Sequence, residues 1–391
     1  MKRPLIAAIA CGALISSTLL AAASASAHDR DRSGPITAGT PSTLVDSLLT
    51  PLSLDVDRRG VSYLSQDFAG KLTRVDRDGT ATDIVTAPEG ASIGAVSTRR
   101  GNVYYSQRVD SPVLMQLDRD GVSTPLADLG QYEADNNPDQ DNTYGFVDLP
   151  EACAAQFPAD AEGQSQPVYT GLIDSNPYAS LALKDGVYVA DAGANAILRV
   201  DYDGEVSTVA VLPPGDPVTV SADLVASQGF PECAAGLEYR FEPVPTDVEV
   251  GPDGRLYVTT LPGGPEDPSL GARGSVYKVN PWNGKVKLVA TGFVGATDLA
   301  VSKNSGTIFV AELFGGEGAT GQVSMVRSGS DTPTALIALS GPAAIELRRN
   351  TLYVTTDAFA VDPDTGAPKA EGKLTLVPLD RGPREDSDDE G

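Results

Sequence analysis

The chain has 391 residues, with 29 Lys and Arg against 53 Asp and Glu, and a formal net charge of −24. Nucleic acids and anionic membranes are recognised through positive charge, so this balance argues against both as partners. Roughly 340 residues remain for folding once the polar ends are set aside, enough for one large all-β domain or two ordinary domains. We expect a monomer.

The first 27 residues have the order of a secretory signal peptide. Lys2 and Arg3 precede an apolar run, which ends in the small residues ASA at 25–27. This order predicts cleavage after Ala27 and a secreted, extracellular protein. Cys11 leaves lipidation open as an alternative, although no Leu stands three residues before it. No later apolar run is long enough to span a membrane, so membrane insertion is not expected.

Two cysteines, Cys153 and Cys233, remain after the signal peptide is removed. Neither belongs to a C-x-x-C metal pattern, and an exposed thiol is reactive outside the cell. We therefore predict one disulfide between them. Two free thiols are the alternative.

A short apolar run around an aromatic residue occurs six times. The copies are GVSYLSQ, GNVYYSQ, DGVYVAD, DGRLYVTT, SGTIFVAE and NTLYVTT, with the aromatic residues Tyr63, Tyr104, Tyr188, Tyr257, Phe309 and Tyr353. Each copy follows another alternating segment and a turn of the kind that closes a β-hairpin. A third strand follows, and in most copies a fourth. Four short strands recurring about every 40–50 residues predict the blades of a β-propeller.

We therefore predict an all-β fold, a six-bladed β-propeller of four-stranded antiparallel blades over residues 42–380. Insertions at about 130–175 and 213–243 contain the two cysteines, and we expect loops there without a core of their own. The last repeat has three strands, so STLVDSLL at 42–49 is predicted to complete it and close the ring. A polar linker, 28–41, precedes the propeller, and the acidic tail, 381–391, is expected to be disordered.

The most distinctive segments lie in the third and fourth repeats. They are SNPYASLALKDGVYVADAGANAILRVDYDG at 175–204 and VPTDVEVGPDGRLYVTTLPG at 244–263. Together with NPDQDNTYG at 137–145, they resemble the ScyD/ScyE family of exported propeller proteins, over about residues 42–380. More distantly, VADAGANAILRVD resembles the NHL-type and SMP-30/gluconolactonase six-bladed propellers. The resemblance implies a propeller, and a fold alone assigns no activity.

The best candidate site is the rim of the central opening. In propellers of this type the innermost strand begins, and the second strand ends, on one face near the axis. The positions three residues after the repeated aromatics are Gln66, Gln107, Asp191, Thr260, Glu312 and Thr356. The starts of the inner strands add Ser53, Ser180, Asp247, Asp298 and Ala344.

Two interpretations of the rim carboxylates remain open. Asp191, Glu312, Asp247 and Asp298 offer the hard oxygen ligands that suit Ca²⁺ or Mg²⁺, and such an ion could polarise a lactone or ester carbonyl. Alternatively, the carboxylates cap strand ends and accept backbone N–H bonds in a solvated channel. We favour the second interpretation, because strand alternation delivers polar residues to this rim in any case.

The only histidine is His28, at the start of the mature chain. A catalytic triad, a His-liganded zinc and a histidine base are therefore excluded inside the propeller. There is no Walker loop, and GGEGATG at 315–321 lies between strands, so no nucleotide cofactor is expected. The sequence favours a binding or scaffold protein for a small molecule, glycan or protein. A divalent-metal-dependent lactone or ester hydrolase is the alternative, and the sequence does not decide between them.

The two insertions are rich in aromatic residues, namely Tyr132, Tyr144, Phe146, Tyr169, Phe230, Tyr239 and Phe241. They could form a lid or a lip that binds a partner. We expect instead that they pack over the outer edges of the blades, because long loops need anchors.

The words VDRDG at 75–79, LDRDG at 117–121 and VDYDG at 200–204 resemble calcium loops at first sight. As EF-hand loops they would place Arg74, Gln116 and Arg199 at the first ligand position, so all three fail. We predict turns between the third and fourth strands, in which the first Asp accepts backbone N–H groups and Gly supplies a positive φ.

Overall fold

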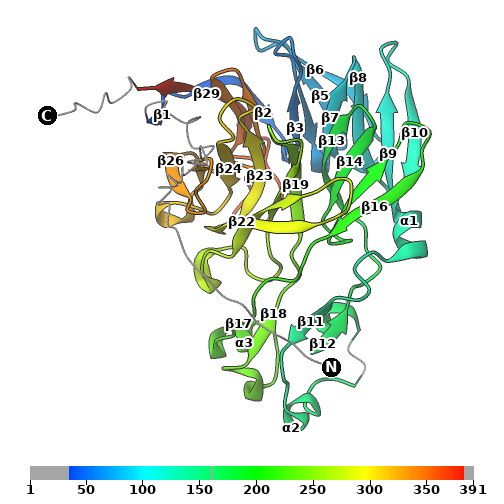
Figure 1. Cartoon of the computed structure of the whole chain (residues 1–391), viewed down its shortest axis with the longest axis vertical. Helices are drawn as coiled ribbons and strands as arrows, with labels where there is room; N and C mark the ends of the chain where they lie inside the picture. The colour runs from blue at the N-terminus through cyan, green and yellow to red at the C-terminus, as the bar shows by residue number, and fades with distance from the viewer. Residues whose placement is uncertain (1–34, 160–161, 383–391) are drawn as a thin grey trace, which may run out of the picture. The chain divides into compact units, whose positions relative to one another are not determined.

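The computed structural model describes residues 35–159 and 162–382, which belong to one compact unit. The predicted signal peptide, residues 28–34 of the predicted polar linker and the acidic tail from residue 383 lie outside the described residues. Part of the predicted linker is instead a strand, β1 (Ile36–Ala38). The described chain consists mainly of short strands, arranged in antiparallel sheets (Figure 1). The predicted all-β fold class is confirmed.

Five sheets are each made of four consecutive strands. The first is β3 (Leu54–Val56), β4 (Ser62–Gln66), β5 (Lys71–Val75) and β6 (Ala81–Thr86), and the second is β7 (Ser92–Arg99), β8 (Asn102–Arg108), β9 (Pro112–Leu117) and β10 (Ser123–Asp128). The third is β13 (Pro177–Leu183), β14 (Gly186–Asp191), β15 (Ala196–Val200) and β16 (Val206–Val211). The fourth is β19 (Pro245–Val250), β20 (Leu256–Thr260), β21 (Gly274–Val279) and β22 (Val286–Phe293), and the fifth is β23 (Ala296–Val301), β24 (Ile308–Glu312), β25 (Gln322–Val326) and β26 (Thr334–Ala338).

The sixth sheet joins the two ends of the described chain. It contains β27 (Ile345–Arg348), β28 (Thr351–Thr356) and β29 (Gly372–Arg381). On the outer side of β29, β2 (Ser42–Leu48) pairs with it from Leu376 to Gly372, and β1 (Ile36–Ala38) pairs with its far end. The prediction that an N-terminal strand completes the last sheet is confirmed, and β1 extends this pairing beyond the predicted segment.

Hydrophobic clusters lie between neighbouring sheets all the way around. One of them packs Leu72 of β5 against Ile93 and Tyr105 of the second sheet. Four more join the following pairs of sheets, and the cluster with Leu374 and Leu54 joins the sixth sheet to the first. The innermost strands contact one another in the order β3, β7, β13, β19, β23, β27 and again β3. The sheets therefore form a closed ring around an axis.

The second strand is wholly buried in three of the sheets. Every residue of β14, β20 and β24 is buried, whereas the outer strands β6 and β26 have no buried residue and β16 has one. A strand covered on both faces carries a continuous apolar run, whereas a half-covered strand alternates. This burial explains why the second strand is the part of the repeat that the sequence shows most clearly.

The two insertions combine into a seventh sheet. Its strand order is β12 (Val168–Thr170), β11 (Thr143–Phe146), β18 (Glu238–Arg240) and β17 (Val218–Thr219), so each insertion supplies two strands. In Figure 1 these strands lie together, apart from the other six sheets. The helices are α1 (Leu129–Asn136), α2 (Glu151–Ala154) and α3 (Ala222–Ser227), with 3-10 turns at Asp67–Ala69, Gly163–Ser165, Glu232–Ala234, Pro268–Leu270 and Glu317–Ala319. None of the helices in the described part of the chain is long and apolar enough to cross a membrane.

The seventh sheet has its own apolar core. Phe146 meets Tyr239 edge to face, with ring centroids 4.9 Å apart, and Phe230 lies against both rings. Cys153 belongs to the same cluster and forms the predicted disulfide with Cys233. The expectation of coreless loops is therefore wrong. The expectation that the insertion aromatics cover the outer edges of the blades is wrong for Phe146, Phe230 and Tyr239, whereas Tyr132 does pack against the second and third sheets. Two insertions together bury enough apolar surface to fold, which neither could do alone.

The Asp-Gly turns between third and fourth strands behave as predicted, with one exception. Asp118 and Asp201 each accept two backbone N–H bonds through Oδ1, at 2.9–3.0 Å. Gly79, Gly121 and Gly204 have φ of 88°, 82° and 93°. In the first copy the Oδ1 atom of Asp76 instead accepts from the Arg74 guanidinium at 2.5 Å. The turns need no metal.

Replacing Cys153 and Cys233 together by Ala should loosen the seventh sheet before the ring. The bond joins residues 80 apart in sequence, and a cross-link of this kind typically contributes about 2–4 kcal/mol. Limited proteolysis with mass mapping should show first cleavages within the two insertions. Dithiothreitol should reproduce the effect in the wild type and add nothing in the variant. Cleavage that begins in the ring strands would contradict this assignment.

Candidate functional site

The predicted rim residues at the ends of the second strands bond mostly within their own sheets. Gln66, Asp191 and Glu312 each accept a backbone N–H bond, at 2.8, 2.7 and 2.7 Å, from the segment that precedes the inner strand of the same sheet. Thr260 and Thr356 bond to third strands, at 3.5 and 2.8 Å. Gln107 is half-buried at the end of β8. These side chains fasten each sheet to the incoming chain.

The carboxylates of Asp191 and Glu312 are fully engaged. Asp191 also accepts from the Ser175 hydroxyl at 2.6 Å and from the Ala194 N–H at 3.2 Å. Glu312 accepts from Nε2 of Gln322 at 2.9 Å through its second oxygen. Both therefore match the strand-capping interpretation.

Asp247 and Asp298 lie together on neighbouring inner strands. Burial raises the pKa of both carboxyl groups, that of Asp247 to about 7 and that of Asp298 well above its ordinary value, and the repulsion between the two adds to the effect on Asp298. Asp247 also accepts from the Leu299 N–H at 3.1 Å. This backbone bond joins the fourth sheet to the fifth.

The structure thus brings together two of the four predicted metal ligands, Asp247 and Asp298, while Asp191 and Glu312 serve their own sheets. Across residues 35–159 and 162–382, no three His, Cys, Asp or Glu side chains are grouped so as to hold an ion. Metal binding at the rim stays a prediction. The physical reason for the difference is that backbone N–H groups at the strand ends already use the carboxylate oxygens.

The other inner-strand positions join one sheet to the next. The Ser53 hydroxyl accepts from the Val96 N–H at 2.8 Å, and the Ser180 hydroxyl donates to the Ala95 carbonyl at 2.5 Å. In the sixth sheet, by contrast, the Ala344 N–H donates to the hydroxyl of Thr355 within the same sheet, at 2.8 Å. An inner strand is a sheet edge, and its unpaired backbone groups need such partners.

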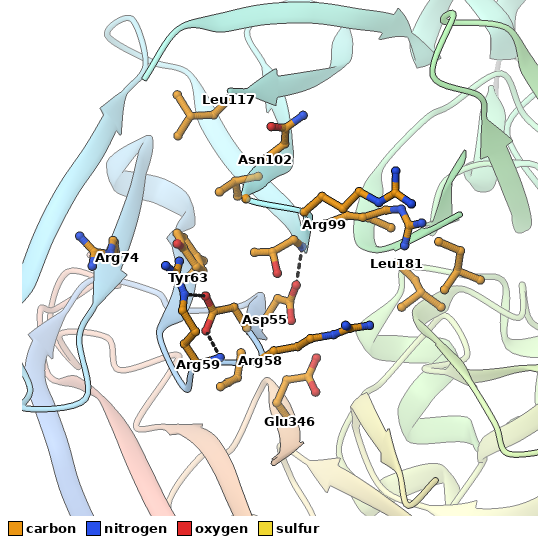
Figure 2. Close-up of a pocket in the computed structure, with 18 of the residues that line it drawn as sticks. Asp55, Arg58, Arg59, Tyr63, Arg74, Arg99, Asn102, Leu117, Leu181 and Glu346 are labelled. Carbon is orange, nitrogen blue, oxygen red and sulfur yellow. Dashed lines mark hydrogen bonds and ion pairs between the residues drawn. The ribbon is translucent and has the colours of Figure 1, made fainter. Parts of the chain in front are cut away.

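A cavity of about 1250 Å³ opens at the other ends of the inner strands, where the turns to the second strands lie. Its lining comes from all six sheets of the ring, and none of the predicted rim residues takes part. We call it the axial funnel; its floor carries Asp55, Glu249 and Glu346. The mouth carries Arg58, Arg59, Arg74 and Arg99, which Figure 2 labels, and the lining also includes Arg100, Arg119, Lys303 and Arg348. In a chain with a large negative charge, the mouth of the funnel is cationic.

The carboxyl groups of the funnel floor are hard to ionise. Burial raises the pKa of Asp55 to about 6, although Oδ2 accepts from the Thr98 N–H. Burial also raises the pKa of Glu346 well above its ordinary value, with the charge of Glu249 next in effect. Burial raises the pKa of Glu249 as well, but the Lys303 ammonium, 3.4 Å from the Glu249 carboxylate, opposes this shift. All three floor carboxyl groups therefore bind protons more readily than exposed carboxyl groups do.

Two tight turns place arginines at the mouth. In the turn DRRG at 57–60, Asp57 Oδ1 accepts from the Arg59 and Val61 N–H groups at 2.7 and 3.0 Å, and Gly60 has φ 83°. Between β7 and β8 the two-residue loop of Arg100 and Gly101 has φ of 52° and 88°, which matches a type I′ hairpin. Neither turn uses an arginine side chain to hold its backbone, so these side chains can extend away from the turn.

Several mouth arginines have protein partners and others do not. Arg59 pairs with Asp57 at 3.1 Å, and Arg348 donates to the Arg58 carbonyl at 2.6 Å. Within the described residues, the guanidinium groups of Arg58, Arg99 and Arg100 make no hydrogen bond or ion pair. Figure 2 shows Arg58 and Arg99 extending across the funnel toward the side of Leu181, with Asp55 and Glu346 beside Arg58. Two long cations are therefore available to a ligand.

The sequence contains a repeated pattern that indicates this site, although the prediction of a site at the rim did not include it. Arg-Arg occurs at 58–59, 99–100 and 348–349, each time in the turn between first and second strands or at the end of the strand that leads into it. These turns belong to the first, second and sixth sheets, which are consecutive in the closed ring. If the repeats are aligned on the turns between first and second strands, these arginines fall at equivalent positions, which predicts that they lie on the same face of the ring.

No family model and no curated protein matches the chain. Solved structures do match it. The PQQ-bound aldose sugar dehydrogenase from Streptomyces coelicolor is 12% identical with a TM-score of 0.53, and the match covers 89% of this chain and 99% of that one. A gluconolactonase from Xanthomonas campestris is 11% identical with a TM-score of 0.50, covering 89% and 98%. Virginiamycin B lyase from Staphylococcus aureus, with Quinupristin, is 13% identical with a TM-score of 0.46, covering 88% and 99%.

The fold is a β-propeller. The ring of sheets and the match over nearly the whole length of two solved propellers agree on this. At such low identity the likeness extends to the fold and not to the chemistry of the funnel.

Replacing Asp55 by Asn should stabilise the propeller at high pH. In the wild type, the folded state binds the Asp55 proton more tightly than the unfolded chain does. Proton binding therefore stabilises the folded wild type fully below about pH 3.8, and this contribution is lost as the pH rises through about 6. At pH 8 the variant should be more stable by about 1–3 kcal/mol, with no such gain at pH 4. Urea unfolding at both pH values measures this. The exposed Asp110→Asn is the matched control, and an equal gain in both variants would refute the assignment.

Proposed function

We propose that the protein is an exported six-bladed β-propeller of the ScyD/ScyE type that binds a small anionic molecule in the axial funnel. Six sheets contact in a closed ring, and the seventh has a core separate from the clusters between them, which supports a count of six blades. The disulfide suits an oxidising compartment and supports export. The family assignment rests on the sequence words in the third and fourth repeats.

The observation that carries the proposed function is the pair of unpartnered guanidinium groups, Arg58 and Arg99, directed into a large cavity (Figure 2). Guanidinium groups bind carboxylates and phosphates through paired N–H donors. The mouth would attract and orient an anion, in contrast to the net charge of the chain. A ligand for this cavity is therefore acidic.

The floor suggests what the rest of the ligand contains. Asp55, Glu249 and Glu346 carry carboxyl groups whose pKa values burial raises, so they offer hydrogen-bond acceptors when ionised and also a donor when protonated. Hydroxyl groups use both kinds of bond. An acidic saccharide or another polyhydroxylated acid fits this combination, and about 1250 Å³ would admit more than one ring.

The alternative, a divalent-metal-dependent lactone or ester hydrolase of the SMP-30/gluconolactonase type, gains no support from the placement of its expected ligands. Asp191 and Glu312 are bonded to backbone N–H groups of their own sheets. The likeness to the gluconolactonase concerns the fold alone. Binding without turnover is the simpler function for this geometry.

Isothermal titration with trigalacturonate, and with neutral maltotriose as its uncharged counterpart, tests the proposal. The acidic sugar should bind, more weakly as salt is raised, and maltotriose should not. The double variant Arg58→Ala with Arg99→Ala should lose about 10-fold or more in affinity, because each charge-assisted bond contributes about 1.5–3 kcal/mol.

Arg327→Ala removes an exposed arginine outside the funnel and should leave the affinity unchanged. Equal binding of both sugars, equal affinity in the double variant, or no binding of trigalacturonate at millimolar concentration would each contradict the proposal. Hydrolysis of glucono-δ-lactone that depends on added Ca²⁺ or Mg²⁺ would favour the alternative.

A further inference from the structure

Four buried oxygens in one short segment have no hydrogen-bond partner. They are Oε1 and Oε2 of Glu133, Oδ1 of Asn137 and Oδ1 of Asp139. Only seven buried side-chain nitrogen or oxygen atoms lack a partner in the described residues, and these four lie within seven residues of one another. Glu133 and Asp139 are each 1% exposed. A buried carboxylate without donors is costly unless a cation or a proton compensates it.

The local sequence directs these oxygens toward the same region. Asp128 caps the start of α1, where its side chain accepts from the Gln131 N–H at 2.9 Å. The helix ends at Asn137, which has φ 37° and donates its N–H to the Glu133 carbonyl at 2.8 Å. The left-handed residue reverses the chain, so the segment after it returns past the last turn of the helix, which carries Glu133.

Neighbouring groups fix the orientation of the free oxygens. Oδ2 of Asp139 accepts from the Tyr144 hydroxyl and from Nδ2 of Asn195, both at 2.9 Å, which leaves Oδ1 unbonded. Nδ2 of Asn137 donates to the Gly171 carbonyl at 2.9 Å, which identifies Oδ1 as the remaining amide atom. A Cβ on Gly171 would fall 2.0 Å from Oδ1 of Asp139, so the site tolerates only glycine there. The side chains are held in place before any ligand arrives.

The negative charge around Glu133 and Asp139 also favours a bound cation. Glu133 and Asp139 form no ion pair with Lys or Arg among the described residues. Burial and, next in effect, the charges of Asp191 and Asp139 raise the pKa of Glu133 to about 8. The surroundings of Glu133 are thus negative, and its oxygens are acceptors.

We propose that Glu133, Asn137 and Asp139 bind a calcium ion at the C-terminal end of α1. Carboxylate and amide oxygens are the ligands that Ca²⁺ takes, six to eight in number, and Glu133 can supply both of its oxygens. Backbone carbonyls or water must complete the set, since only two of these side chains are acidic. The absence of nitrogen and sulfur ligands argues against zinc, and a site without strict octahedral geometry favours Ca²⁺ over Mg²⁺.

The site is distinct from the axial funnel and from the predicted metal site at the rim. It lies where the first insertion leaves the ring: α1 contacts β9, and the Tyr132 hydroxyl is 2.9 Å from that of Thr208 on β16 (Figure 1). Asn195, which holds Asp139, also accepts from the Val244 N–H at 3.0 Å, beside the end of the second insertion. A bound ion would therefore tie both insertions to the ring.

Thermal unfolding of the full chain, first treated with EGTA and then titrated with CaCl₂, tests this proposal. Saturating calcium should raise the Tm of the wild type by about 3–5 °C, more than MgCl₂ at equal concentration. Glu133→Gln keeps the shape and removes the charge, so it should fold, show no calcium response and have an ion-free Tm no lower than that of the wild type. The exposed Glu89→Gln should respond like the wild type.

Stoichiometry and luminescence keep the test independent of stability. Equilibrium dialysis should find one calcium per chain that Glu133→Gln and Asp139→Asn both lose. Tyr144 touches Asp139, so bound Tb³⁺ should show tyrosine-sensitised emission that calcium displaces. A folded wild type that ignores millimolar calcium, an unchanged response in Glu133→Gln, or an equal response to magnesium would overturn the assignment.

Discussion

The ring depends on the way each inner strand satisfies its free edge. An inner strand pairs with only one neighbour in its sheet, and its other edge carries unpaired N–H and C=O groups facing the axis. Side chains from adjacent inner strands supply the partners. Ser53 accepts from Val96, Asp247 accepts from Leu299, and the Thr297 hydroxyl donates to the Ala343 carbonyl at 2.7 Å. Serine, threonine and aspartate therefore gather at the axis for a structural reason.

This arrangement sets the electrostatics of the molecule. Carboxyl groups that serve the inner strands are buried near one another, which raises their pKa values, as it does for Asp247 and Asp298. At the ends of the same strands the chain turns outward, and three turns carry paired arginines. The funnel therefore combines carboxyl groups of raised pKa at its floor with cations at its mouth. The position of each kind of group follows from its place along the strand.

Sequence reasoning succeeded where one strand or one pair of residues carried the information. The second strands could be predicted from their continuous apolar runs. The disulfide could be predicted because only two cysteines remain in an oxidising compartment. It failed where separate segments had to be combined. The aromatics of the two insertions build a shared core around Phe146 and Tyr239, and neither insertion alone shows it. The rim carboxylates Asp191 and Glu312 were correctly placed at strand ends, but their oxygens meet backbone N–H groups that no sequence pattern marks.

By itself, the sequence determined the repeat, the all-β class, the closing strand and the disulfide, because each depends on periodicity or on the chemistry of few residues. Tertiary structure alone decided which polar groups stay free. Arg58 and Arg99 converge because their sheets are adjacent in the ring. Glu133 lacks a partner because the chain reverses at Asn137 and buries it. Hydrogen-bond satisfaction is a property of three-dimensional surroundings, so one-dimensional spacing cannot assign it.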